Sequence, residues 1–125
     1  MMSTAEKKKT LILGASANPQ RYSYLALTRL LNAGHEVVAI GRERTAINGV
    51  AVDTEKKPYP NVHTVTLYLN PAHQEEYYDY ILSLHPKRII FNPGAENEVL
   101  RHMAGEKGIE TMEACTLVLL STGQY

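Results

Sequence analysis

Short apolar segments alternate along this chain with stretches in which apolar residues recur every three or four positions. The segments 11–13, 35–40, 62–69, 88–91 and 109–112 are short, contain Leu, Ile, Val, Thr or aromatic residues and are bounded by turns, which predicts five strands of a buried sheet. Helical spacing appears over 24–33, 77–84 and 99–104, as in helices that pack on a sheet. The pattern therefore predicts β-α-β units with parallel strands.

Turn residues mark the ends of these elements. Gly34 and Gly108 follow two of the helical stretches and provide C-terminal stops. Asn70 can cap the next helix with Pro71 at its first position, and Pro86 ends that helix. The apolar run 116–120 is too short for its period to distinguish a helical turn from a strand.

The stretch 41–61 has no helical period and is interrupted by Asn48-Gly49 and by Pro58-Tyr-Pro60. We therefore expect the second crossover helix to be missing or shortened, with short extended pieces near 50–52. A second interpretation is an excursion that partly covers a ligand, because long loops are often functional.

The predicted fold is an α/β, Rossmann-like, doubly wound sheet of about five parallel strands in the order 3-2-1-4-5. One domain would span residues 10–125, and the polar residues 1–9 would form a flexible lead-in. In this order the first and fourth strands are neighbours. The turns that begin at Gly14 and Asn92 would then lie side by side at the switch point, where such sheets bind ligands.

Composition limits the size and the partners of the domain. The chain has 125 residues, 44% of them hydrophobic, which fits one globular domain and leaves no room for a second catalytic domain. With 13 Lys and Arg against 13 Asp and Glu, charge gives no support for a nucleic-acid or membrane partner. The only cysteine, Cys115, cannot form an intrachain disulfide, and residues 1–9 lack the apolar core of a signal peptide, so we expect a cytoplasmic location.

The stretch 10–24 joins the first predicted strand to the first predicted helix through a turn of small residues. A helix start offers free N–H groups to an anion, so Gly14 to Tyr24 is interpreted as a phosphate-facing turn of a nucleotide-binding domain. The turn Gly14-Ala-Ser-Ala-Asn-Pro19 does not match the dinucleotide pattern G-x-G-x-x-G. An ordinary tight turn is the alternative.

The end of the second predicted strand distinguishes between nucleotides. An NAD site normally places an acid there to bind the ribose 2′-hydroxyl, whereas this chain has Gly41-Arg42-Glu43-Arg44. Guanidinium groups bind phosphate bidentately. A ligand with a phosphorylated ribose, which means CoA or NADP, is therefore favoured over NAD, and a solvated charged loop is the alternative.

Four motifs together carry a resemblance to a known family. They are Gly14-Ala-Ser-Ala-Asn-Pro-x-Arg-x-Ser-Tyr24, the basic turn after the second strand, Leu69-Asn-Pro71 and Asn92-Pro-Gly-x-x-Asn-Glu98. In these motifs the chain resembles the small stand-alone CoA-binding proteins, which are similar in fold to the CoA-binding N-terminal domain of the succinyl-CoA synthetase alpha subunit. Relatives often have Asn-Pro-Lys where this chain has Gly41-Arg42, so the two differ at the end of the second strand.

The resemblance implies a binding site for CoA or an acyl-CoA. The first turn and the helix start would hold the ADP phosphates, an arginine after the second strand would meet a ribose or diphosphate oxygen, and the third and fourth turns would form the walls. The candidate binding residues are Gly14, Ala15, Ser16, Asn18, Pro19, Arg21, Tyr22, Ser23, Arg42, Arg44, Leu69, Asn70, Pro71, Asn92, Pro93 and Gly94.

No catalytic constellation is recognisable in the sequence, and the histidines, which include His73 and His102, do not have metal-ligand spacing. Cys115 is expected to be a buried, unreactive thiol, with a mixed disulfide to the CoA thiol as the alternative. Glu96 and Glu98 suit a helix N-terminus without any reaction.

Three functions follow from these observations. The first is non-catalytic binding of CoA or an acyl-CoA, with a protein partner or a homodimer possible. The second is a small NADP-binding oxidoreductase, or an enzyme subunit that needs a second chain. The third is an interaction module with an empty crevice.

Overall fold

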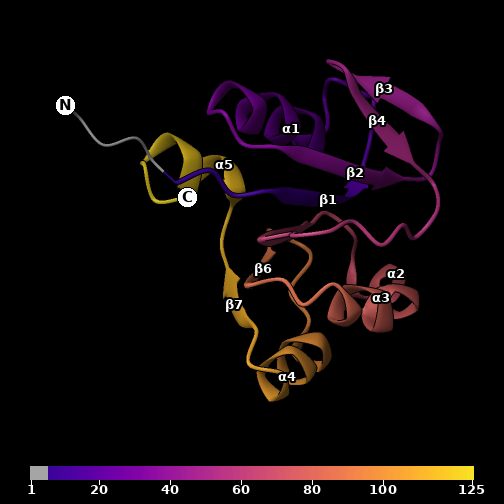
Figure 1. Cartoon of the computed structure of the whole chain (residues 1–125), viewed down its shortest axis with the longest axis vertical. Helices are drawn as coiled ribbons and strands as arrows, with labels where there is room; N and C mark the ends of the chain where they lie inside the picture. Colours follow the sequence, from indigo (N-terminus) through magenta and orange to yellow (C-terminus); the bar gives the residue numbers. More distant parts are fainter. Residues whose placement is uncertain (1–5) are drawn as a thin grey trace.

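The computed structural model describes residues 6–125, in which a central sheet is covered by helices (Figure 1). The elements, in chain order, are β1 (Thr10–Ala15), α1 (Tyr22–Asn32), β2 (Val37–Gly41), β3 (Thr45–Ile47), β4 (Val50–Asp53), β5 (Thr64–Leu67), α2 (Pro71–Gln74), the 3-10 turn η1 (Glu75–Tyr77), α3 (Tyr78–Ser83), β6 (Arg88–Phe91), α4 (Glu98–Glu106), β7 (Glu110–Glu113) and α5 (Thr116–Ser121).

The sheet has seven strands in the order β3-β4-β2-β1-β5-β6-β7. Every neighbouring pair is parallel except β3 with β4, which is an antiparallel hairpin. The chain is thus an α/β, Rossmann-like single domain with a mostly parallel sheet, and the predicted class is confirmed.

The predicted strand order was wrong. The segment expected to be the third strand, now β5, pairs with β1, and β4 takes the place beside β2. The prediction failed because the extended piece near 50–52 was not counted among the strands of the sheet, although β4 is the outer neighbour of β2. The turns after β1 and β5 are therefore adjacent, and one strand separates the Gly14 turn from the Asn92 turn.

The stretch 41–61 contains the β3–β4 hairpin in place of a crossover helix, as the missing period indicated. The hairpin turns at Asn48 and Gly49, whose φ angles are 49° and 85°, which suits a two-residue type I′ turn. The predicted extended piece near 50–52 is confirmed as β4. The run 116–120, which the sequence left open, is helical.

The core lies on both faces of the sheet. In β1, Leu11 and Leu13 face one cluster of buried side chains, which also contains residues of α3 and α4. Ile12 faces the other cluster, which includes Leu27 and Leu30 of α1. Because successive strand residues point to opposite faces, an uninterrupted apolar strand is what a sheet covered on both sides requires.

The amino-terminal edge of the sheet is closed by Tyr125. Its ring lies 5.0 Å from the His35 ring centre and 4.3 Å from the Arg88 guanidinium carbon, and its hydroxyl hydrogen-bonds with Thr10. Burial, together with the nearby cations, lowers the pKa of His35. Residues 1–5 of the predicted lead-in lie outside the described part of the chain, whereas the backbone of Lys8 donates to His35 at 2.9 Å.

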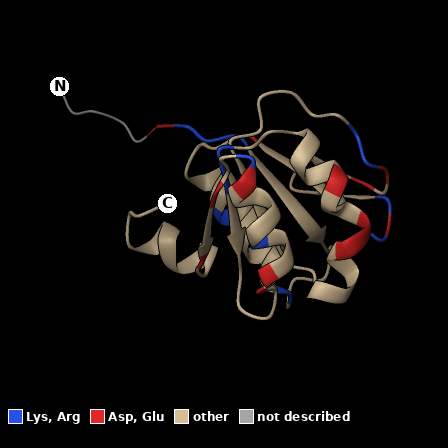
Figure 2. Cartoon of the chain, turned by 90° about the horizontal axis from the view of Figure 1, so that it is seen from below, with Lys and Arg blue, Asp and Glu red and all other residues tan. Residues whose placement is uncertain are grey.

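Lys and Arg, like Asp and Glu, occur on several elements of the described chain rather than on one face (Figure 2). None of the helices in residues 6–125 is long and apolar enough to cross a membrane.

Candidate functional site

A cavity of about 1030 Å³ opens at the carboxyl edge of the sheet, where ligands bind in doubly wound folds. It is lined by the loop after β1 with the start of α1, by the end of β2, by the β5–α2 turn with α2 and η1, and by the β6–α4 turn. The lining residues are Gly14, Ala15, Ser16, Ala17, Asn18, Gln20, Arg21, Tyr22, Ser23, Ile40, Gly41, Arg42, Glu43, Arg44, Thr45, Tyr68, Leu69, Asn70, His73, Glu76, Tyr77, Pro93, Gly94 and Ala95.

The turn after β1 depends on Gly14. Its φ is +99°, and a Cβ at this position would lie 3.0 Å from the carbonyl carbon of Tyr68. Glycine adopts this conformation at little cost and lets the end of β5 approach. Further along, Ser16 Oγ accepts the Asn18 N–H at 3.1 Å, and Asn18 Oδ1 accepts the N–H two residues later at 3.0 Å. These short-range bonds give the loop a defined shape while leaving the Ser16 hydroxyl hydrogen and the Asn18 NH₂ for a ligand.

The start of α1 is an open helix N-terminus. Arg21, in an extended conformation, is the residue that precedes the helix, no side chain caps it, and the first turn holds no acid. The first N–H groups of a helix have no partner within it, and the helix dipole favours negative charge there. Arg21, Tyr22 and Ser23 all line the cavity, and Tyr22 is 71% exposed. This end of α1 can therefore hold an anion such as a diphosphate.

The end of β2 approaches β1 so closely that only glycine fits. The register of β1 shifts between Leu13 and Ala15, which brings Ala15 opposite Gly41. A Cβ on Gly41 would lie 2.3 Å from the Ala15 carbonyl oxygen. Gly41 thereby lets the following residues, Arg42 to Arg44, reach the cavity.

The two arginines after β2 have different partners. Arg44 donates to the Glu55 carboxylate at 2.6 Å, and both side chains are largely exposed. Arg42 Nη2 lies 3.4 Å from His73 Nδ1, and no carboxylate of the described residues pairs with Arg42. An anion that enters the cavity finds Arg42 free of any competing ion pair.

The wall formed by the β5–α2 turn is fixed by a buried amide. Asn70 caps α2 by accepting a backbone N–H at 3.0 Å, which confirms the predicted cap. The fully buried Gln74 donates to the carbonyls of Leu69 and Ala95, both at 2.7 Å, and accepts from Asn97 at 3.0 Å. Because Leu69 and Ala95 both line the cavity, one in the turn after β5 and the other in the turn after β6, Gln74 connects two of its walls.

Asn92 is buried and does not line the cavity. Its Nδ2 donates to Thr66 Oγ1 at 2.7 Å and to the Leu67 carbonyl at 2.9 Å, and its Oδ1 accepts the Thr116 N–H at 2.9 Å. The side chain thus joins β5, β6 and the start of α5. Its polar atoms are engaged inside the protein, while the Pro93 and Gly94 that follow line the cavity.

The structure brings most of the predicted site residues to one cavity; Pro19, Pro71 and Asn92 do not line it. Sequence reasoning missed the lining residues Ala17, Gln20, Ile40, Gly41, Glu43, Thr45, Tyr68, His73, Glu76, Tyr77 and Ala95. His73 lies three residues after Asn70, and Glu76 and Tyr77 lie three and four residues after His73, so this helical period could have found them. Burial raises the pKa of Tyr68 to about 12.

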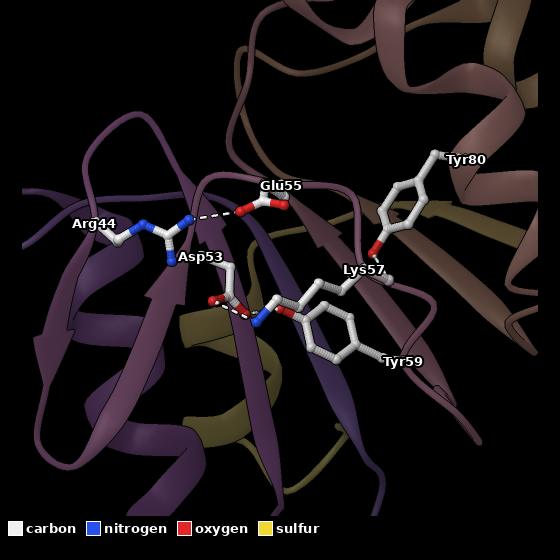
Figure 3. A network of polar contacts seen from close by, with 6 residues as sticks. All are labelled: Arg44, Asp53, Glu55, Lys57, Tyr59 and Tyr80. Carbon is white, nitrogen blue, oxygen red and sulfur yellow. Dashed lines mark hydrogen bonds and ion pairs between the residues drawn. The ribbon is translucent and has the colours of Figure 1, made fainter.

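The loop after β4 is held by a network around Asp53 (Figure 3). The Asp53 carboxylate accepts from the Tyr59 hydroxyl and, at 3.1 Å, from the Lys57 ammonium. These interactions, of which the Tyr59 hydrogen bond is the strongest, lower the pKa of Asp53. The Tyr80 hydroxyl donates to the Lys57 carbonyl, so the loop is fastened to α3. None of residues 54–61 lines the cavity, whereas residues 41–45 do, so only the first part of the stretch 41–61 reaches the candidate site.

A smaller hollow of about 340 Å³ lies on α4, between Glu98, Arg101, His102 and Glu106. Its charged side chains pair with one another along the exposed helix, Arg101 with Glu98 and His102 with Glu106. All of its lining residues belong to α4, so it has no walls from other elements and we assign it no function.

Cys115 is a free, partly buried thiol at the residue before α5, and it does not line the cavity. Within residues 6–125 no three His, Cys, Asp or Glu side chains are grouped so that they could hold a metal ion.

The fold and the site define a Rossmann-like domain with a nucleotide-sized cavity at its carboxyl edge. A family model described as a CoA binding domain matches residues 8–121. The chain belongs to this CoA-binding domain family.

Solved structures with a similar fold cover nearly the whole of this chain. A crystal structure of an uncharacterized protein is similar to this chain with a TM-score of 0.94 and 50% identity, covering 96% of this chain and 99% of the other. A hypothetical protein from Pyrococcus horikoshii OT3 has a TM-score of 0.85 at 21% identity, covering 95% and 85%. An NADPH-dependent glyoxylate/hydroxypyruvate reductase from Sinorhizobium meliloti has a TM-score of 0.63 at 13% identity, covering 92% of this chain but 52% of the reductase. These last two likenesses concern the fold alone. A comparison with curated proteins gave no match.

Proposed function

We propose that this protein binds CoA or an acyl-CoA in the cavity at the carboxyl edge of its sheet and performs no reaction of its own on it. The observation that carries the proposal is the convergence of Arg21, Arg42 and Arg44 on the same cavity as the Gly14 turn. An NAD site has an acid at the end of the second strand, whereas the only acid in the turn after β2, Glu43, lies between Arg42 and Arg44. Guanidinium groups suit a ligand with several phosphate groups, and membership of the CoA-binding domain family supports CoA.

The cavity suggests a placement for the ligand. The diphosphate would lie against the turn 14–18 and the open N-terminus of α1, with the phosphorylated ribose toward Arg42 and Arg44. The β5–α2 turn, at Leu69 to Pro71, and the β6–α4 turn would enclose the adenine and pantetheine parts. The volume of about 1030 Å³ lies at the upper end of the range for small-molecule sites, as a ligand of this length requires.

The second candidate is an NADP-binding oxidoreductase or an enzyme subunit completed by another chain. The same arginines favour it, because NADP also carries a phosphorylated ribose. The similar NADPH-dependent reductase is about twice the length that this chain covers, so a reductase built on this chain would need a substrate domain from a partner. An interaction module with an empty crevice is the third candidate.

Thermal unfolding with CoA, acetyl-CoA, NADP, NAD and AMP at equal concentration separates these candidates. A ligand at about 100 times its Kd stabilises the native state by roughly 2.7 kcal/mol, which raises Tm on the order of 10 °C for a domain of this size. We expect this rise with CoA and acetyl-CoA. A rise with NADP and none with CoA would refute CoA binding, and no rise with any of the five would favour the interaction module.

Two substitutions assign the binding to this cavity. Arg42→Ala and Arg44→Ala should each weaken CoA binding, by on the order of 1.5 to 3 kcal/mol for a lost charged hydrogen bond. Arg29→Ala is the matched control, because Arg29 is exposed in the last turn of α1 and does not line the cavity. Unchanged affinity in both cavity variants would place the ligand elsewhere.

The proposal includes a cytoplasmic location. The free thiol of Cys115 supports it, because reduced cysteines are typical of that compartment. A protein partner that reads the CoA-bound state, or a second copy of this chain, would give the binding a consequence.

A further inference from the structure

His73 lines the cavity, and it was not among the predicted binding residues. It is exposed, it belongs to the short helix α2, and its ring nitrogen Nδ1 is 3.4 Å from Arg42 Nη2. Arg42 follows β2 and His73 follows β5, and these two strands flank β1 on either side. The two side chains therefore meet from opposite sides of the strand whose turn contains Gly14.

The contact defines what the pair can offer to a ligand. A guanidinium can only donate, so Nδ1 of the His73 ring accepts and its proton lies on Nε2. The pair thus presents an imidazole N–H beside the remaining N–H groups of Arg42. Arg42 has no carboxylate partner among residues 6–125, whereas Arg44 is occupied by Glu55. Two convergent donors, one of them on a permanent cation, suit a group with several acceptor oxygens and negative charge.

Other charges on the cavity limit which anion this pair would accept. Glu43 and Glu76 line the same cavity and repel every anion, so an anion binds here only where its hydrogen bonds to cationic donors outweigh that repulsion. A terminal phosphate monoester carries more charge and three acceptor oxygens. A diphosphate inside a chain is better matched by the open end of α1, where the backbone N–H groups lie.

We propose, resting on the CoA-binding function above, that His73 and Arg42 together bind the phosphate monoester on the ribose of the nucleotide. His73 is then a specificity-determining residue: it distinguishes CoA from dephospho-CoA. NADP differs from NAD in the same way, by a phosphate on a ribose, so the pair would recognise the ribose phosphate of CoA or of NADP.

Isothermal titration calorimetry with the two ligand pairs tests this assignment. The full chain and its His73→Ala and Arg42→Ala variants are titrated with CoA and dephospho-CoA, and then with NADP and NAD. His102→Ala is the matched control, because His102 is exposed on α4 away from the cavity. Since His73 is exposed, the variant should unfold at the same temperature as the parent, and a melt of each variant verifies this.

We expect the parent to bind CoA about tenfold or more tightly than dephospho-CoA, as one charged hydrogen bond contributes at least that factor. His73→Ala should lose most of this ratio while its affinity for dephospho-CoA stays within about twofold, since only the phosphate contact is removed. His102→Ala should keep the ratio.

Three results distinguish the possible failures. Equal parent affinities for CoA and dephospho-CoA, or an equal loss for both ligands in His73→Ala, would overturn the assignment of His73 and leave CoA binding intact. A His73-dependent preference for NADP over NAD without any CoA binding would support the phosphate site and overturn the CoA proposal. Absence of binding by all four nucleotides would overturn both.

Discussion

Asn92 provides the sharpest test of how the cavity is built. The sequence suggested that it contacts a ligand, whereas in the structure it is a buried side chain whose hydrogen bonds join neighbouring elements. Asn92→Ala removes three hydrogen bonds, to Thr66, Leu67 and Thr116, of 2.7 to 2.9 Å. Each contributes about 1 kcal/mol net, and buried groups that lose their partner add to the cost. Thr66 keeps its 2.8 Å bond with Thr116, but the Leu67 carbonyl and the Thr116 N–H lose Asn92. We therefore expect a loss of about 3 to 5 kcal/mol in the free energy of unfolding.

Urea unfolding followed by circular dichroism measures this loss. The control is Asn32→Ala, at an exposed position in the last turn of α1, where we expect a change within about 0.5 kcal/mol. Asn92→Asp is a second variant: it keeps the acceptor for Thr116 but buries a carboxylate against two acceptors, so it should lose at least as much stability at neutral pH. If the free energy of unfolding of Asn92→Ala stays within about 1 kcal/mol of the parent's while CoA binding is lost, the structural role of Asn92 is refuted and Asn92 contacts the ligand.

Three further predictions concern the rest of the fold. Gly41→Ala should lower the free energy of unfolding in urea by about 1 to 3 kcal/mol, since its Cβ would lie 2.3 Å from a carbonyl oxygen. Gly105→Ala, with open space around its Cβ, should raise it by about 0.5 to 1 kcal/mol. Equal effects of the two substitutions would contradict the close approach at Gly41. Burial holds the pKa of His35 below 6.5, so the neutral ring contributes its whole stabilisation above pH 6.5, and this stabilisation falls as the pH drops toward the pKa in the folded state. His35→Gln should show a shallower fall in Tm over that pH interval. Hydrogen bonds hold the pKa of Asp53 below 3.8, so the carboxylate stabilises the fold above pH 3.8 and this stabilisation disappears in stronger acid. The difference in Tm between Asp53→Asn and the parent should therefore narrow below pH 3.8. A constant difference would argue against the network.

Much of the architecture could be predicted because it depends on local signals. Uninterrupted apolar runs identified the buried strands, and Asn70 with Pro71 identified the start of α2. The strand order could not be predicted in the same way. Which strand pairs with β1 depends on the hairpin of residues 45–53, whose own strands are three and four residues long and give too little periodicity to be recognised.

The candidate site also contains a part that local sequence predicts and a part that it does not. The turn after β1 was predictable because Gly14 and the residues behind it form one continuous segment. The role of Asn92 was not, because its three partners lie 24 to 26 residues away in the sequence. Gln74 was missed for the same reason: a buried amide that joins two turns resembles any helix glutamine until the turns are placed.

The ring of Tyr125 shows that the packed core includes residues beyond the family match. The family match ends at residue 121, yet Tyr125 is 8% exposed and lies between His35 and Arg88. A fragment cut where the family pattern ends would remove the ring that covers the Arg88 guanidinium and one of the two hydrogen-bond partners of the Thr10 hydroxyl. Tyr125, which lies beyond the family match, is therefore part of the packed core of this chain and covers the edge of the sheet opposite the cavity.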